Sequence, residues 1–426
     1  MSQQAPLLPH HNEEWSRPKR GMLTTVVVPI LLLASILFVT IKGDGGVPED
    51  ALGKAEYYLK SSPVIDGHID LPDFARSVFG NNISSFNLYE TTPGHLDIPR
   101  LRDGLLGGFF WSIFVECETT NDQDFMSYAF DRLLDTLEQI DVANNLIEKY
   151  SDTFVHARTA DDIENAIKRG KVASIYGLEG GHSLGNSLGV LRTYYELGVR
   201  YLTLTHSCNN AFADSAGIFE NVEERWSGLS SFGKELIPEL NRLGIFVDIS
   251  HVSDKTALQA LALTRAPVIL SHSCARHFNN LSRNVPDEVL DKIGKGKGKN
   301  NGVVMVNFFP LFASSTPDDV DVSYIADEIE YIVKKTSKFN VGIGSDYDGI
   351  ESTPKGLEDV SKYPYLFAEL IKRGWSQYDL VLLSGGNLLR ALRDVEAVSR
   401  KLRAQRGPSM AKYDKRHDLD GGKWEF

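Results

Sequence analysis

The stretch VIDGHID, residues 64–70, is a short apolar run that ends in a His-x-Asp pair. Side chains alternate between the two faces of an extended strand, so His68 and Asp70 point in the same direction. An imidazole and a carboxylate on one face, directly after a buried strand, can form half of a metal site. The other half must come from segments whose ends meet this one in space.

Seven further apolar or β-branched runs follow, and stretches with helical patterns separate them. The predicted strands cover residues 64–66, 108–115, 172–176, 201–205, 246–250, 268–271, 303–307 and 341–345. The predicted helices include residues 122–150, 159–168, 230–243, 254–263 and 326–338. Alternating strands and helices indicate parallel strands joined by right-handed crossovers. Eight such units predict an α/β fold of the (β/α)8 TIM barrel type.

Metal-binding or acid–base residues recur at the ends of six of the eight predicted strands. Barrel enzymes carry their chemistry at the C-terminal ends of their strands. These residues, in chain order, are His68, Asp70, Glu179, His206, His251, His272 and Asp346, and Asn307 follows the seventh predicted strand. Taken singly, a histidine near a strand end is more often a hydrogen-bonded structural residue, and a loop carboxylate is often solvated or caps a helix. We interpret Asp66 and Asp348 in this structural way, because each has a better-placed neighbour, whereas the shared position of the others favours one site.

Imidazole and carboxylate ligands without cysteine suit zinc better than manganese or cobalt. Three histidines and two acids exceed what one four-coordinate zinc needs, and they fit two metals about 3.5–4 Å apart with a bridging carboxylate. Such a pair indicates hydrolysis of an amide or ester. Arg283 follows the sixth predicted strand and could bind a substrate carboxylate, with a surface salt bridge as the alternative and Arg276 as the nearest competitor.

Composition and the N-terminal segment limit the class of protein. The 426-residue chain has a net charge of -12 and no evident basic patch, which argues against nucleic-acid binding. Residues 22–41 are uncharged and mostly apolar, long enough to cross a bilayer as a helix. Basic residues concentrate before this run, which predicts a type II membrane protein with its body extracellular or lumenal. A cleaved signal peptide, which would give a secreted protein, is the alternative.

The predicted organisation has five parts and agrees with a body outside the cytosol. These are a cytoplasmic tail (1–21), a transmembrane helix (22–41), a linker (42–50), the barrel (51–403) and a polar tail (404–426). Asn82 and Asn280 begin glycosylation sequons. The three cysteines, Cys117, Cys208 and Cys274, allow one disulfide and leave one thiol over.

A series of motifs carries a resemblance to a known family. The chain reads VIDGHIDLP (64–72), YGLEGGHSL (176–184), YLTLTHSCNNAFADS (201–215), VDISHVSD (247–254), PVILSHS (267–273), RNVPDE (283–288), GVVMVNF (302–308), GIGSDYDGI (342–350) and KGLEDVSKYP (355–364). In this order the motifs resemble those of the membrane dipeptidases, also called renal dipeptidases or peptidase family M19. The resemblance implies a (β/α)8 barrel, a binuclear zinc site and cleavage of dipeptides that have a free C-terminal carboxylate.

The resemblance also implies a role for each matching residue. The metal ligands would be His68 and Asp70 for the first zinc, His251 and His272 for the second, and Glu179 as the bridge. His206 would contact the scissile carbonyl and stabilise the oxyanion, Arg283 would bind the substrate carboxylate, and Asp346 would move the proton. Glu179, His206 and Asp346 are thus the expected catalytic residues. A hydroxide that bridges the metals would be the nucleophile.

The resemblance pairs Cys117 with Cys208 in a disulfide and leaves Cys274 free. Phe309 departs from the family, because members often have tyrosine there, and an N-terminal span replaces the lipid anchor of mammalian members. We therefore expect a membrane metallodipeptidase for L-dipeptides. A metal-dependent amidohydrolase for a Cys-Gly conjugate or another amide is the first alternative, and an inactive membrane-anchored binding barrel is the second. The expected partners are a dipeptide, the bilayer and, in a homodimer, a second copy of the chain.

Overall fold

Nine parallel strands form one sheet in the described part of the computed structural model, which comprises residues 46–117, 124–127 and 129–419. The strands are β1 (Val64–Ile69), β2 (Leu106–Phe114), β3 (Phe154–His156), β4 (Val172–Glu179), β5 (Val199–Thr203), β6 (Phe246–Asp248), β7 (Ile269–Ser273), β8 (Val303–Val306) and β9 (Val341–Ile343). They follow the order β2-β1-β9-β8-β7-β6-β5-β4-β3, and an additional β2–β4 pairing closes the sheet. Eight strands therefore form the barrel, while β3 pairs with the first residues of β4.

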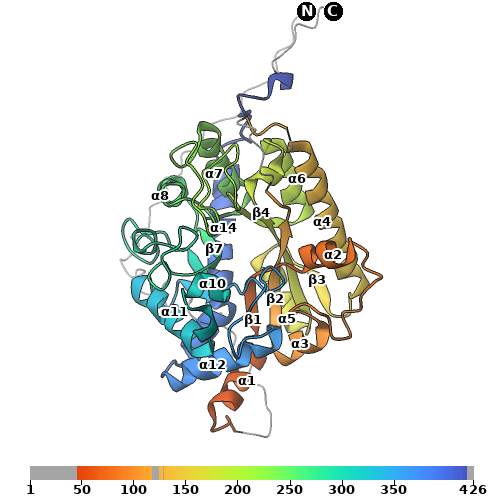
Figure 1. The fold of residues 1–426 in the computed structure, drawn as a ribbon, viewed down its shortest axis with the longest axis vertical. Coiled ribbons are helices and arrows are strands. Elements are labelled where there is room, and N and C mark those ends of the chain that lie inside the picture. The colour runs from red at the N-terminus through yellow and green to blue at the C-terminus, as the bar shows by residue number, and fades with distance from the viewer. Residues whose placement is uncertain (1–45, 118–123, 128, 420–426) are drawn as a thin grey trace, which may run out of the picture. The chain divides into compact units, whose positions relative to one another are not determined.

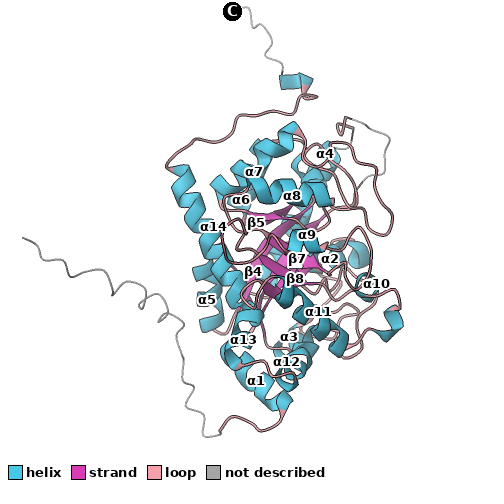
Figure 2. Ribbon diagram, turned by 90° about the vertical axis from the view of Figure 1, so that its left-hand side faces the viewer, coloured by secondary structure: helices cyan, strands magenta, loops and turns pink. Residues whose placement is uncertain are grey.

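Helices surround this barrel (Figures 1 and 2). They are α1 (Ala51–Ser61), α2 (Leu71–Phe79), α3 (Ile98–Asp103), α4 (Ala129–Lys149), α5 (Ala160–Lys168), α6 (Leu188–Leu197), α7 (Ser231–Leu243), α8 (Asp254–Leu263), α9 (Asp287–Leu290), α10 (Pro310–Ala313), α11 (Val322–Lys335), α12 (Tyr363–Lys372), α13 (Gln377–Val381) and α14 (Asn387–Arg403). The predicted (β/α)8 barrel is confirmed.

Local sequence explains where several helices begin. The Thr159 side chain accepts a hydrogen bond from the backbone of Asp162, whose carboxylate accepts one from the Thr159 backbone, and α5 begins with this capping box. Ser230 and Ser253 cap α7 and α8 through their side-chain oxygens. Gly244 follows α7 with φ at 89°, a left-handed conformation that glycine adopts without steric cost.

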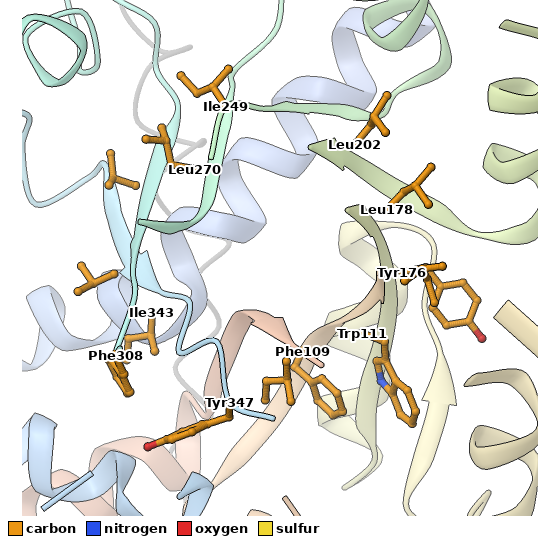
Figure 3. Packing of buried hydrophobic residues seen from close by; sticks show 14 of the residues in the cluster. Phe109, Trp111, Tyr176, Leu178, Leu202, Ile249, Leu270, Phe308, Ile343 and Tyr347 are labelled. Atoms are coloured by element: carbon orange, nitrogen blue, oxygen red, sulfur yellow. The ribbon is translucent and has the colours of Figure 1, made fainter. Parts of the chain in front are cut away.

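Two sets of apolar side chains alternate along the strands. Phe109, Trp111 and Tyr176 belong to the larger cluster, which packs the strands against the helices (Figure 3). Phe110, which lies between Phe109 and Trp111 on β2, belongs with Tyr201 to the smaller cluster, and their ring centroids are 4.8 Å apart. This alternation follows from the two-residue period of a strand. One set fills the barrel and the other holds the helices to it.

Some predicted boundaries are wrong. Residues 124–127 are not helical and α4 begins at Ala129, whereas the predicted helix began at residue 122. The last predicted helix, at 326–338, lies at 322–335, where Asp321 caps it. β1 continues to Ile69 rather than ending at residue 66, and β3 was not predicted. A three-residue strand offers too little sequence pattern to be distinguished from a loop.

The chain ends are only partly described. The predicted tail and span, residues 1–41, lie outside the described residues, as do part of the linker and residues 420–426. In the part of the chain that the structure covers, no helix is both long and apolar enough to cross a membrane. Within the predicted C-terminal tail, Tyr413 is buried and its ring lies 5.8 Å from that of Phe232, so this segment packs against α7.

Candidate metal centre

The end of β1 places His68 and Asp70 side by side, as their spacing predicts. His68 Nε2 lies 3.1 Å from Asp70 Oδ2, and both residues are buried. Neither of these two atoms has a hydrogen bond of suitable geometry to a described residue. Buried polar atoms nearly always have a partner. Two buried atoms that lack a hydrogen bond and face the same point therefore fit the ligands of a metal ion.

Glu179, the last residue of β4, joins this pair to a second set of donors. Its Oε2 lies 3.3 Å from His68 Nε2 and accepts a hydrogen bond from Ser112 Oγ at 3.1 Å. Its Oε1 lies 3.2 Å from His251 Nε2 and 3.3 Å from His272 Nε2. Each carboxylate oxygen therefore faces a different group of histidines, which is the geometry of a bridging ligand.

His251 and His272 bring their ring nitrogens together. Their Nε2 atoms are 2.8 Å apart, and burial lowers the pKa of both imidazoles well below the usual value. Both rings are therefore neutral at pH 7 and present nitrogens to the same point as Glu179. His251 has φ at 63°, a conformation that non-glycine residues rarely adopt and that often marks functional sites. Neutral imidazoles and carboxylates in this arrangement fit a metal centre.

Contacts behind the histidines fix their orientation. His68 Nδ1 lies 2.7 Å from Tyr201 Oη, and His272 Nδ1 lies 2.8 Å from Ser271 Oγ. Ser271 Oγ donates to Asp248 Oδ2 at 2.6 Å, so the His272 Nδ1–H donates to Ser271 and the Nε2 lone pair faces the site. Such partners hold metal ligands in the required tautomer and orientation.

These supporting residues were not predicted from the sequence. Asp248 and Ser271 are polar residues inside apolar runs, a signal that could have identified them, because buried polar groups need partners. Tyr201 offers no such signal. Its ring fits only because residue 177 is glycine: a Cβ there would lie 1.9 Å from the Tyr201 ring.

Asp346 lies beside the first ligand pair. Its Oδ1 is 3.7 Å from His68 Nε2, and Asn307 Nδ2 donates to its Oδ2 at 2.8 Å. Burial raises the pKa of Asp346 to about 8. Its φ is 68°, so Asp346, like His251, combines a rare backbone conformation with a position at the site. A carboxyl with a raised pKa and one held oxygen suits proton transfer.

His206 and Arg283 complete the rim. A His206 ring nitrogen lies within 4.8 Å of ligand atoms of Glu179 and His251. Arg283 is 3 % exposed, and its Nη2 donates to the His272 backbone oxygen at 2.8 Å. Its Nε has no hydrogen-bond partner, and the structure records no ion pair of Arg283 with a described residue. Burial of a cation without a counter-ion costs free energy, so the position beside Arg283 favours binding of an anion.

The competing candidates lie elsewhere or have structural partners. Arg276 pairs with Asp254 at 2.6 Å and is not available to an anion in the same way. Asp66 lies inside β1 and accepts hydrogen bonds from the backbone of His68 and from Tyr363 Oη. Asp348 accepts from the backbone of His95. The structure thus brings together every predicted ligand, and Asp66 and Asp348 make structural contacts.

Comparison with known proteins places this site in a family. The model of the membrane dipeptidases, peptidase family M19, matches residues 52–406. The chain belongs to the membrane dipeptidase family. As a family member it is a metal-dependent hydrolase, and the predicted family and enzyme class are confirmed.

Solved structures of similar proteins agree with this family assignment. A metallopeptidase from Rhodobacter sphaeroides, liganded with a phosphinate mimic of the dipeptide L-Ala-D-Ala, is 25% identical and matches 78% of this chain and 99% of its own chain, with a TM-score of 0.68. The probable dipeptidase PvdM from Pseudomonas aeruginosa is 23% identical over 82% of this chain and 99% of its own, with a TM-score of 0.73, and it supports the fold.

The cysteines and sequons of this chain can also be placed. Cys117 and Cys208 form a disulfide, as predicted, and Cys274 is a buried free thiol. Asn82 and Asn280 are exposed, and their glycosylation stays a prediction. The disulfide joins the end of β2 to the loop after β5, which carries His206.

Proposed function

We propose that this membrane dipeptidase is a zinc enzyme that hydrolyses L-dipeptides with a free C-terminal carboxylate. The proposal rests on the buried guanidinium of Arg283, which lacks a carboxylate partner among the described residues. This guanidinium donates to the backbone oxygen of His272, so it lies beside the strand that bears a predicted metal ligand. A guanidinium binds a carboxylate through paired, charge-assisted hydrogen bonds. Such a bond at one end of a small substrate would position the peptide bond over the ligand cluster.

Five side chains would hold two zinc ions. His68 and Asp70 would bind one, His251 and His272 the other, and the two oxygens of Glu179 would reach both. When bound, the ions would polarise the scissile carbonyl and lower the pKa of water.

The remaining residues would handle the substrate and the proton. Asp346 would accept a proton from the attacking water and deliver it to the leaving amine nitrogen. Asn307 would keep its carboxyl oriented through the 2.8 Å hydrogen bond. His206 would donate a hydrogen bond to the oxygen that gains negative charge as the carbonyl carbon becomes tetrahedral.

Hydrolysis of matched substrates tests this proposal. L-Ala-L-Ala should be hydrolysed and its C-terminal amide at least about 100-fold more slowly, because the amide cannot pair with Arg283. Cys-Gly conjugates belong in the same panel, since they are the alternative substrates. Treatment with a chelator should abolish activity and zinc should restore it. Arg283→Met should remove the preference for the free carboxylate, whereas Arg276→Met should keep it.

Equal rates on the acid and the amide would contradict the role of Arg283. Full activity after removal of the metal would contradict the zinc mechanism. A faster reaction with Cys-Gly conjugates than with plain dipeptides would favour the alternative substrate class.

The proposal includes a location outside the cytosol, anchored by residues 22–41 as a type II membrane protein. The apolar run and the basic residues before it support this location. The Cys117–Cys208 disulfide supports it as well, because such bonds persist in oxidising compartments. N-terminal sequencing of the mature protein should start before residue 22. A start after residue 41 would show that the segment is cleaved.

A further inference from the structure

Three phenylalanine rings contact one another beside Arg283, and neither the ligands nor the proton transfer uses them. The ring centroids of Phe309 and Phe312 are 4.9 Å apart, and the Phe219 ring lies 5.6 Å from Phe312 and 6.4 Å from Phe309. We name this set (Phe219, Phe309 and Phe312) the aromatic wall. Its members come from two segments that are far apart in sequence, the loop after β5 and the segment after β8.

The aromatic wall touches the rim of the site on two sides. The Arg283 guanidinium carbon lies 5.1 Å from the centroid of the Phe312 ring. The Phe309 N–H donates to Asn307 Oδ1, and Asn307 in turn binds Asp346. The wall therefore starts between the residue proposed to hold the substrate carboxylate and the residue proposed to move the proton.

The loop that carries Phe219 is tied to the same rim. The Ala216 N–H donates to the backbone oxygen of His251 at 2.8 Å, and Ser282 Oγ donates to the Ala216 oxygen at 2.7 Å. Ser282 precedes Arg283 directly. These bonds fix the start of the Phe219 segment relative to both a ligand histidine and the arginine.

Exposure of the wall increases from the site toward solvent. Phe309 and Phe312 are each 4 % exposed, whereas Phe219 is 53 % exposed. A single exposed aromatic side chain is ordinary on a protein surface. Phe219 differs because its ring extends two buried rings, one of which lies against the Arg283 guanidinium. The inner part of the aromatic wall is therefore buried, and its outer part is exposed to solvent.

We propose that the aromatic wall binds the side chain of the C-terminal residue of the dipeptide and selects large apolar or aromatic side chains there. The inference rests on the proposed function, which places the substrate carboxylate on Arg283. The amide nitrogen of that residue must point toward Glu179 and the metal ligands. The side chain would then point toward Phe312, whose ring centroid lies 5.1 Å from the Arg283 guanidinium carbon. Because Phe219 is open to solvent, the subsite accepts a long side chain.

Loss of the outermost ring should act on binding rather than on chemistry. Phe219→Ala should raise KM for L-Ala-L-Phe by roughly 3- to 10-fold, because one aromatic contact with the substrate is lost. The same variant should leave KM for L-Ala-Gly unchanged, since glycine has no side chain to contact the wall. kcat should change little with either substrate, because a contact made equally in the ground and transition states affects KM alone.

The experiment measures kcat and KM of the full-length zinc enzyme with L-Ala-L-Phe and L-Ala-Gly. The variants are Phe219→Ala, the conservative Phe219→Tyr and, as a matched control, Tyr378→Ala. Tyr378 is an exposed aromatic residue on α13, which packs against α1, and α1 leads into the N-terminal end of β1. We expect the KM ratio of the two substrates to change in Phe219→Ala only.

The outcomes separate this inference from the proposed function. A KM increase of equal size for both substrates, or no change for either, overturns the role of the aromatic wall while dipeptide hydrolysis stands. Hydrolysis of neither dipeptide by the wild-type enzyme overturns the proposed function and the wall subsite with it. Retention of the substrate ratio in Phe219→Tyr supports a ring contact, and its loss in Phe219→Tyr contradicts one.

Discussion

His272 is held from two sides, with Nε2 at the ligand cluster and Nδ1 against Ser271 Oγ, which in turn donates to Asp248. Ser271→Ala removes the middle of this chain and leaves Asp248 without one of its donors. We expect about a 10- to 100-fold loss of zinc affinity, the usual effect of removing a partner of a metal-ligating histidine. Competition with a chelator of known affinity measures it.

The matched control for this prediction is Ser61→Ala, an exposed serine on α1 whose hydroxyl donates to the Tyr58 backbone oxygen. It should leave zinc affinity unchanged. Equal affinities in Ser271→Ala and the wild type would show that Ser271 does not orient the ligand.

At the scale of elements, α11 supports the loop between His272 and Arg283 through Glu328. This fully buried carboxyl accepts a hydrogen bond from the Ala275 N–H at 2.7 Å, and burial raises its pKa to about 8. Between the ordinary pKa and about 8, the unfolded chain releases this proton while the folded chain keeps it. The unfolded state then binds fewer protons, so Glu328 makes stability fall as pH rises through this window.

Glu328→Gln should remove this loss, because glutamine can accept the same hydrogen bond and never ionises. The variant should therefore be more stable relative to wild type at pH 9 than at pH 5, which means a larger positive difference in the free energy of unfolding at pH 9. Urea unfolding at both pH values measures the difference, with the exposed Glu56→Gln on α1 as the control. A difference that does not change with pH would show that Glu328 ionises as easily in the folded protein as in the unfolded chain.

Elements with strong patterns were predictable, and weakly patterned ones were not. The helix at 254–263 was predicted with its observed bounds, and the Ser253 side chain caps its start. β3 has only three residues, and its place is determined by pairing with β4. The first turn of the helix predicted at 122–150 was wrong, because polar residues that suit a helix are compatible with a loop as well.

At the scale of the whole molecule, the barrel explains why the clustering of the predicted ligand residues followed from the sequence and their supporting contacts did not. Parallel closure gathers the ends of all strands, so residues as distant in sequence as His68 and His272 must meet. Tyr201 reaches His68 from inside the barrel, and the space it needs depends on Gly177. The aromatic wall likewise joins segments whose contact only the folded chain defines. The positions of the strand ends follow from the topology of the barrel, whereas these contacts depend on how individual side chains pack.

The central claim is that two zinc ions, shared through Glu179, support dipeptide hydrolysis. Titration of the metal-free protein with zinc, while hydrolysis of L-Ala-L-Ala is followed, tests it most directly. If two zinc ions support hydrolysis, the rate should rise with added zinc and reach its plateau at two equivalents of zinc per chain. A plateau at one equivalent, or activity that does not depend on zinc, would contradict it.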